Sequence, residues 1–215
     1  DRVVATLKYT DLLPEVLPNL AADPSEPVTV AAIKRACIQF CRESWVWKSL
    51  PDAADLVAGE TTYDLEVISG ADVSAVINVT ANGVPLKNRN SHWLDTELPG
   101  WRTTRATPKY YTQVDTQQII IAPVPDINVT NGLVMTLAMQ PSQKATGIPA
   151  WIYNQYLYIL AHGALAYLML MPGKAWTDKE LGANYFKLFE NAIADARADA
   201  ESALGRAPVR STYQH

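Results

Sequence analysis

Two cysteines and a histidine are the side chains of this chain that come closest to a catalytic pair. Cys37 and Cys41 stand one helical turn apart, and His162 lies far along the sequence. A thiol beside an imidazole is the usual arrangement of a nucleophilic cysteine. Both cysteines, however, fall on the apolar face of an expected helix, whereas a reactive thiol needs an exposed, electropositive setting. We therefore predict two packed, unreactive thiols and a hydrogen-bonded core histidine.

No other group of residues supplies the parts of an enzyme or of a metal site. The sequence contains no glycine-rich phosphate loop, no G-x-S-x-G elbow and no H-E-x-x-H motif. The histidines are scattered, and the two cysteines alone do not complete a zinc site. Acidic residues gather on the last expected helix and indicate a solvated face: Glu190, Asp195, Asp199 and Glu201. The sequence thus predicts a protein that is not an enzyme and holds no metal and no cofactor.

The charge of the chain limits the partners it can have. The formal net charge is −4, which argues against a protein that binds nucleic acid by neutralising its phosphates. It is compatible with a wall past which DNA slides without being gripped. Charged residues make up 19% of the chain, below the roughly 25% of an average soluble domain. This shortage mildly favours a subunit of an assembly, although ordinary variation between domains accounts for it equally well.

Four helices are expected around a β-rich middle. They span 11–20, 28–49, 148–171 and 177–204. Thr10 is the expected N-cap of the first helix, and Thr177 with Glu180 forms a capping box at the start of the last one. In the second helix, the polar face opposite the apolar residues consists largely of Lys34, Arg35, Gln39 and Arg42.

The run 148–171 is apolar enough to raise the question of a membrane span. It contains Asn154, Gln155 and His162 and has no basic flank, so we predict no contact with a membrane. A helix that is apolar nearly all round is buried on more than one side. Pro149 is expected at its first helical position.

The middle of the chain, 57–140, has the pattern of short strands between turn residues. Expected strands are 61–65, 73–80, 84–86, 109–114, 119–122 and 133–139. Asn82-Gly83 is the best two-residue hairpin signal in the chain. Because no helix is expected between these strands, an antiparallel arrangement is favoured.

A long loop, 87–106, is expected within this middle region, and we call it the Trp–Arg segment. Its candidate contact residues are Arg89, Trp93, Trp101, Arg102 and Arg105. Tryptophan and arginine are both enriched at binding hot spots, which would suit an interface with a partner. The alternative is that the tryptophans cover the sheet and the arginines are solvated. The sequence does not decide between the two.

The hairpin at 107–126, TPKYYTQVDTQQIIIAPVPD, carries a P-x-Y-Y…P-x-P pattern. Proline cannot donate to a strand ladder, so the returning strand must end at Pro123 or lie at an edge. The expected order along the chain is helices, then a small β domain that contains this hairpin, then two long helices. This order resembles that of the head-to-tail adaptor proteins of tailed bacteriophages (tail-tubular or connector proteins).

The resemblance implies an α+β fold: a bundle of about four helices with an inserted small antiparallel β domain and an extended C-terminal tail. The corresponding domains are 1–56 and 141–205 for the bundle, 57–140 for the inserted domain and 206–215 for the tail. The tail carries two arginines and no acidic side chain. Its candidate portal-binding residues are Arg206, Val209, Arg210 and Tyr213.

Proteins of this kind form a ring, generally of twelve subunits, beneath the portal of the phage head. The resemblance therefore implies a homo-oligomeric ring at the head–tail junction of a virion, made in the cytoplasm of a bacterial host. Its other partners would be the portal protein and the next tail protein, a nozzle or a stopper. Double-stranded DNA would pass through the lumen at ejection without sequence-specific binding.

Two other functions remain open on the sequence. One is a different ring of the same conduit, a stopper or tail-completion protein, which would bind a preformed adaptor instead of the portal. The other is a carbohydrate-binding virion module that uses the β domain and its aromatic residues.

Overall fold

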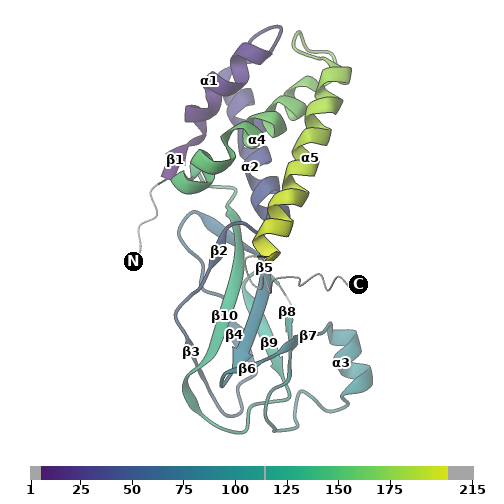
Figure 1. Cartoon of the computed structure of the whole chain (residues 1–215). Helices are drawn as coiled ribbons and strands as arrows, with labels where there is room; N and C mark the ends of the chain where they lie inside the picture. The colour runs from purple at the N-terminus through teal and green to yellow at the C-terminus, as the bar shows by residue number, and fades with distance from the viewer. Residues whose placement is uncertain (1–5, 114, 203–215) are drawn as a thin grey trace, which may run out of the picture. The chain divides into compact units, whose positions relative to one another are not determined.

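A computed structural model describes residues 6–113 and 115–202, and the chain divides into two compact units (Figure 1). The helical unit comprises Asp1–Val46 and Gln143–His215, and the β unit comprises Trp47–Ser142. The fold is α+β, as the sequence predicts. Each unit is described by itself below.

Three long helices form the helical unit: α2 (Glu26–Ser44), α4 (Ala150–Met169) and α5 (Lys179–Ser202). Each of them packs against the other two. Their contacts set their directions, because Phe40 stacks on Tyr156 while Arg35 lies over Tyr167, so α4 runs antiparallel to α2. Helix α5 is antiparallel to α4 in turn and therefore runs in the same direction as α2.

Gly163 lies where α4 approaches both neighbouring helices. A Cβ atom at this position would stand 2.8 Å from the ring of Phe189 on α5 and 2.9 Å from the Cβ of Ala36 on α2. Real Cβ atoms do not approach other atoms that closely, so the three helices can pack at this spacing only around a glycine. This close packing holds the exposed faces of the helices at fixed positions.

The start of the chain differs from the single helix expected over 11–20. It forms strand β1 (Thr6–Lys8), then three short helical segments, η1 (Tyr9–Leu12), α1 (Leu13–Val16) and η2 (Leu17–Asn19). Proline is tolerated only in the first turn of a helix, and Pro14 and Pro18 each stand at the second position of a new segment. Strand β1 pairs antiparallel with β11 (Gly147–Pro149), a pairing that the sequence analysis missed.

Boundaries of the long helices also differ from the expectation. Helix α2 ends at Ser44 and not at position 49, because Trp45 adopts a left-handed conformation with φ of 54°. At the start of α5, the side chain of Asp178 accepts a hydrogen bond from the Leu181 amide, at 2.9 Å. Asp178 is therefore the N-cap, and the predicted capping box with Thr177 in that role is wrong.

Helix α4 begins at Ala150, so Pro149 is its N-cap and not its first helical residue. The helix contributes a large share of the core, with Leu160, Ala164 and Leu168 fully buried. Among the helices of the described residues, none combines the length and the apolar character needed to cross a bilayer.

The β unit contains two sheets. The first has the order β2 (Lys48–Ser49), β10 (Val129–Pro141), β5 (Ala71–Ala81) and β6 (Val84–Pro85), with β3 (Ala54–Leu56) also paired to β10. The second has the order β4 (Thr62–Asp64), β9 (Gln118–Ala122), β8 (Tyr110–Gln113) and β7 (Lys87–Asn88). Named strand pairs are antiparallel except β7–β8, which is parallel.

The predicted hairpin is present as β8 and β9, and β9 ends at Ala122 immediately before Pro123, as expected from the missing amide donor. The Trp–Arg segment is not the continuous loop that the sequence predicted. It contains strand β7 and helix α3 (Ser91–Glu97), where the side chain of Asn90 caps the helix by accepting from the Trp93 amide at 2.7 Å.

Candidate functional site

The two thiols are buried on the core face of α2, as the sequence predicts. Cys37 and Cys41 are both fully buried and unpaired, and burial raises the pKa of each thiol far above its ordinary value. A protonated thiol in an apolar core is a poor nucleophile. These two residues therefore serve packing.

His162 differs in detail from the predicted hydrogen-bonded core histidine. Its ring is half-buried and lies 5.2 Å from the ring of Tyr185, and within the described residues no hydrogen bond to its imidazole is present. Burial lowers the pKa of His162, so the neutral ring is favoured near pH 7. Within the same part of the chain, no three His, Cys, Asp or Glu side chains come together as a metal site.

In the β unit, the Trp–Arg segment is organised around Trp101. This side chain is 2% exposed and packs with Leu94 and Ala122 in a small cluster. Its indole N–H donates to Asp95 Oδ1 at 2.9 Å, and Arg102 pairs with the same carboxylate. The Arg102 guanidinium also lies 4.2 Å from the centre of the Trp101 ring.

The second tryptophan of the segment is held in a similar way. Trp93 is half-buried, with its ring 5.1 Å from that of Tyr110, and the Arg89 guanidinium lies 5.0 Å from the centre of the Trp93 ring. Arg105 does not join these clusters and instead forms an isolated β-bridge with Val124. Four of the five predicted contact residues therefore have partners within the segment. A contact role for this surface stays a prediction, and Arg102 and Arg105 are its exposed members.

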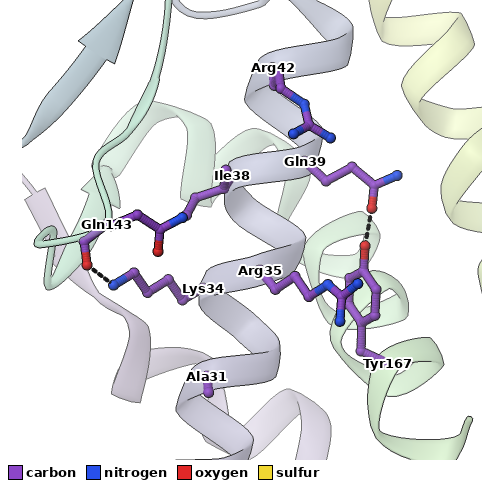
Figure 2. A pocket seen from close by; sticks show the side chains of 8 residues that line it. All are labelled: Ala31, Lys34, Arg35, Ile38, Gln39, Arg42, Gln143 and Tyr167. Carbon is purple, nitrogen blue, oxygen red and sulfur yellow. Dashed lines mark hydrogen bonds between the residues drawn. The ribbon is translucent and has the colours of Figure 1, made fainter. Parts of the chain in front are cut away.

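The helical unit carries a groove along α2 that the sequence analysis did not identify. Its volume is about 690 Å³, and Figure 2 shows the side chains around it. The groove is lined by Ala31, Lys34, Arg35, Ile38, Gln39, Arg42, Gln143 and Tyr167. Three of these side chains are cationic and none is acidic, in a chain whose net charge is −4.

The walls of this α2 groove are held by contacts to other parts of the helical unit. Lys34 donates to the main-chain carbonyl of Gln143, and the Tyr167 hydroxyl donates to Gln39 (Figure 2). The Arg35 guanidinium lies 4.3 Å from the centre of the Tyr167 ring. Cations fixed against aromatic rings and carbonyls keep their charge in place, so the groove is suited to a carboxylate-bearing or phosphate-bearing partner.

Two of the three cations of the groove have no carboxylate partner within the described residues. Arg42 pairs with Glu43 at 3.2 Å on the solvent side, where both side chains remain about half exposed. No carboxylate in this part of the chain lies within ion-pair distance of Lys34 or Arg35. The sequence placed these residues on the polar face of α2 but gave no sign that Gln143 and Tyr167 close the groove.

A second surface of the helical unit combines exposed apolar residues with acidic ones. On α5, Leu181 and Leu188 are 39% and 52% exposed. Asp195 and Asp199 follow on α5 and are exposed as well. Leu181 and Leu188 are thus the large apolar side chains that the described part of α5 leaves exposed.

The remaining acidic residues of α5 agree with the predicted solvated face. Glu190 and Glu201 are exposed, and Glu201 pairs with Arg197 one turn earlier. Arg197 also donates to the main-chain carbonyl of Glu43 at 3.1 Å and covers the ring of Trp45. The predicted portal-binding residues Arg206, Val209, Arg210 and Tyr213 lie outside the described residues.

Comparison with known protein families gives a match. The family model described as "SU10 adaptor protein" matches residues 7–212. No curated protein matches the chain. The family match includes α2, α4 and α5 of the helical unit and the whole of the β unit.

Proposed function

Because the chain belongs to the SU10 adaptor protein family, a family of phage head-to-tail adaptors, we propose that it forms a ring beneath the portal of a phage head. The ring extends the DNA channel and docks the next tail component. Adaptors of the kind that the sequence resembles generally form rings of twelve, and we propose the same number here. The role of such a protein in the virion is structural.

The observation that carries the proposal is the length of the family match. Residues 7–212 span the helical unit and the β unit together, so adaptor function belongs to the chain as a whole and not to one part of it. The exposed surfaces of the helical unit support assembly, because the α2 groove and the Leu181–Leu188 face both offer unpaired binding groups.

We assign the parts of the chain as follows. The bundle segments 1–56 and 141–205 make contacts between copies, and the inserted segment 57–140 faces the next tail protein through Arg102 and Arg105. The tail 206–215 binds the portal, which would make assembly depend on the portal, since a segment that orders on binding loses its entropy only when its site is available. DNA passes through the lumen without specific contacts.

Two alternatives remain distinguishable. A stopper or tail-completion ring would bind a preformed adaptor and leave the portal free. A carbohydrate-binding module would use exposed aromatic residues of the β unit, but the large hydrophobic residues exposed on the described part of that unit are aliphatic: Leu50, Val57, Val67, Val84, Ile127 and Val134. A glycan array probed with the full chain tests the second alternative, because an adaptor shows no specific signal.

Co-sedimentation with portal rings of the virus that encodes this chain tests the proposal. The full chain is expected to sediment with the portal, whereas a version ending at Gly205 is expected to stay in the supernatant. A double substitution, Arg206→Glu with Arg210→Glu, is expected to weaken binding as the truncation does. Equal sedimentation of all versions would remove the tail assignment, and no sedimentation of any version would remove the portal-binding role.

A further inference from the structure

We propose that neighbouring copies in the ring meet through two helices, with the α2 groove of one copy packed in parallel against the exposed face of α5 of the next. The inference deepens the proposed function and rests on it, because it describes how copies of the ring contact one another.

The α2 side of this contact is a straight line of residues. Residues seven apart lie on nearly the same line along a helix of 3.6 residues per turn. Val28, Arg35 and Arg42 have this spacing, and Ala31 and Ile38 form a second line beside them. The line therefore begins apolar and small and ends in two arginines. Its charged part coincides with the groove.

The α5 side has the same spacing and the opposite charge. Leu181, Leu188 and Asp195 are seven residues apart, and Asp199 follows Asp195 by one turn. All four are exposed, and within the described residues neither aspartate has a cationic partner. This line also begins apolar and ends charged, over 14 residues or about 21 Å at the helical rise.

Placed in parallel, the two lines complement each other at both ends. Val28 lies level with Leu181, and Arg42 lies level with Asp195 and close to Asp199, while Arg35 lies level with Leu188 in either orientation. An antiparallel arrangement would set the leucines against Arg42 and the aspartates against Val28, leaving both charges and apolar groups without suitable partners. Charge complementarity thus selects the parallel orientation.

Within one chain, the positions of α2 and α5 relative to each other along their axes are compatible with a closed ring. Arg197 of α5 bonds the carbonyl of Glu43 of α2, so these two positions stand at the same height in the parallel helix pair. A ring closed by pure rotation about an axis along the helices preserves both direction and height. The α5 of the next copy would then present Asp195 and Asp199 at the height of Arg42, and Leu181 at the height of Val28.

A charge-exchange experiment tests this contact with the full chain and portal rings. One variant carries Arg35→Glu and Arg42→Glu, and the other carries Asp195→Lys and Asp199→Lys. Each variant alone is expected to load about tenfold or more fewer copies per portal ring than the unmodified chain, because like charges then face each other at every interface. An equal mixture is expected to restore loading, since alternating copies pair opposite charges at each interface.

The outcomes of the charge-exchange experiment distinguish the proposed contact between copies, a phosphate-binding role of the groove and the adaptor function itself. A matched control, Lys174→Glu with Asp23→Lys, reverses exposed charges elsewhere on the helical unit and is expected to load normally. Normal loading by either variant, or failure of the mixture although circular dichroism shows both variants folded, overturns the inference while leaving the adaptor function standing. Normal loading combined with loss of DNA retention would assign the groove to phosphates instead. Failure of the unmodified chain to load overturns the adaptor function and the inference together.

Crosslinking tests the orientation independently. In a mixture of Arg42→Cys and Asp195→Cys chains on portal rings, mild oxidation is expected to link the two chains, while Val28→Cys mixed with Asp195→Cys is expected to give no link. The native thiols are buried and do not interfere. Linking by the second pair and not the first would overturn the parallel arrangement.

Discussion

The α2 groove and the Trp–Arg segment contain the same kinds of residue but differ in where their cations find partners. In the segment, Arg102 binds Asp95 and covers Trp101, all within 95–102. In the groove, Arg35 rests on Tyr167 yet faces no carboxylate among the described residues. Arginines and aromatic rings that satisfy one another stabilise a local structure. Arginines held in place without a counter-charge leave binding capacity for another molecule.

This difference shows that residue type alone does not identify which arginines lack a counter-charge within the described residues. The sequence singled out the Trp–Arg segment as a contact surface because tryptophan and arginine are enriched at hot spots. It treated the polar face of α2 as ordinary. The two regions can be separated experimentally, since changes in the segment should act on local stability and on docking of the next tail protein, and changes in the groove should act on contacts between copies.

The largest effect is expected for Trp101→Ala. The side chain is almost fully buried among Leu94 and Ala122, so its removal should lower the free energy of unfolding by about 3–5 kcal/mol. Denaturant unfolding followed by circular dichroism measures this change. Trp93→Ala is the matched control and should cost less, because Trp93 is only half-buried. Equal costs for the two tryptophans would contradict the different roles assigned to them.

Gly163→Ala should destabilise the helical unit by about 1–3 kcal/mol, because the added methyl group meets the Phe189 ring and Ala36. Adding Phe189→Leu to this variant should restore part of the loss, since a smaller side chain makes room for the methyl group. A double-mutant cycle of thermal unfolding gives the coupling between the two positions. Additive costs would show that the helices do not press together at this point.

Paired alanine substitutions compare the arginines directly. Arg35→Ala with Arg42→Ala should lower the free energy of unfolding by no more than about 1 kcal/mol, through the lost contact of the exposed Arg35 with Tyr167, yet it should reduce loading on portal rings. Arg102→Ala should cost about 1 kcal/mol of stability through the lost contact with Trp101, and should leave assembly of the helical units intact. If the Arg102 variant lost loading and the Arg35–Arg42 variant kept it, the contact between copies would lie in the Trp–Arg segment and not in the α2 groove.

The smallest effect is expected from acid. Hydrogen bonds from Arg102 and Trp101 lower the pKa of Asp95 below its usual range near 4. A carboxylate with a lowered pKa in the folded state contributes stability above its unfolded pKa, and this contribution is lost as the pH falls through the lowered value. Tryptophan fluorescence of the segment should therefore change at low pH, and Asp95→Asn should flatten that change. If the fluorescence of Asp95→Asn changes at low pH as much as that of the unmodified chain, the Asp95 carboxylate is not the cause of the change.

Local signals in the sequence predicted much of the fold. The missing donor of Pro123 marks the end of β9, and the three- and four-residue spacing of apolar residues marks α2. The end of α2 was missed because Trp45 takes its left-handed conformation beside Arg197, a residue 152 positions away in the sequence. Contacts between residues this far apart in the sequence produce no periodic pattern from which they could be predicted.

The candidate surfaces were harder to predict than the helices for the same reason. Lys34, Arg35 and Arg42 are visible as a polar face, but the groove exists only because Gln143 and Tyr167 close it from other parts of the chain. The seven-residue lines on α2 and α5 were present in the sequence. They gain meaning only when exposure shows that Leu181 and Leu188 stay uncovered within one copy.

Electron microscopy of portal rings mixed with the full chain tests the central claim most directly. Averaged images should show a second ring stacked on the tail side of the portal, and the two rings should share one rotational symmetry axis. The helical units of neighbouring copies should be in contact within this second ring. Portal rings without added density, or with single copies bound at scattered positions, would contradict the assignment of this chain as a ring-forming adaptor.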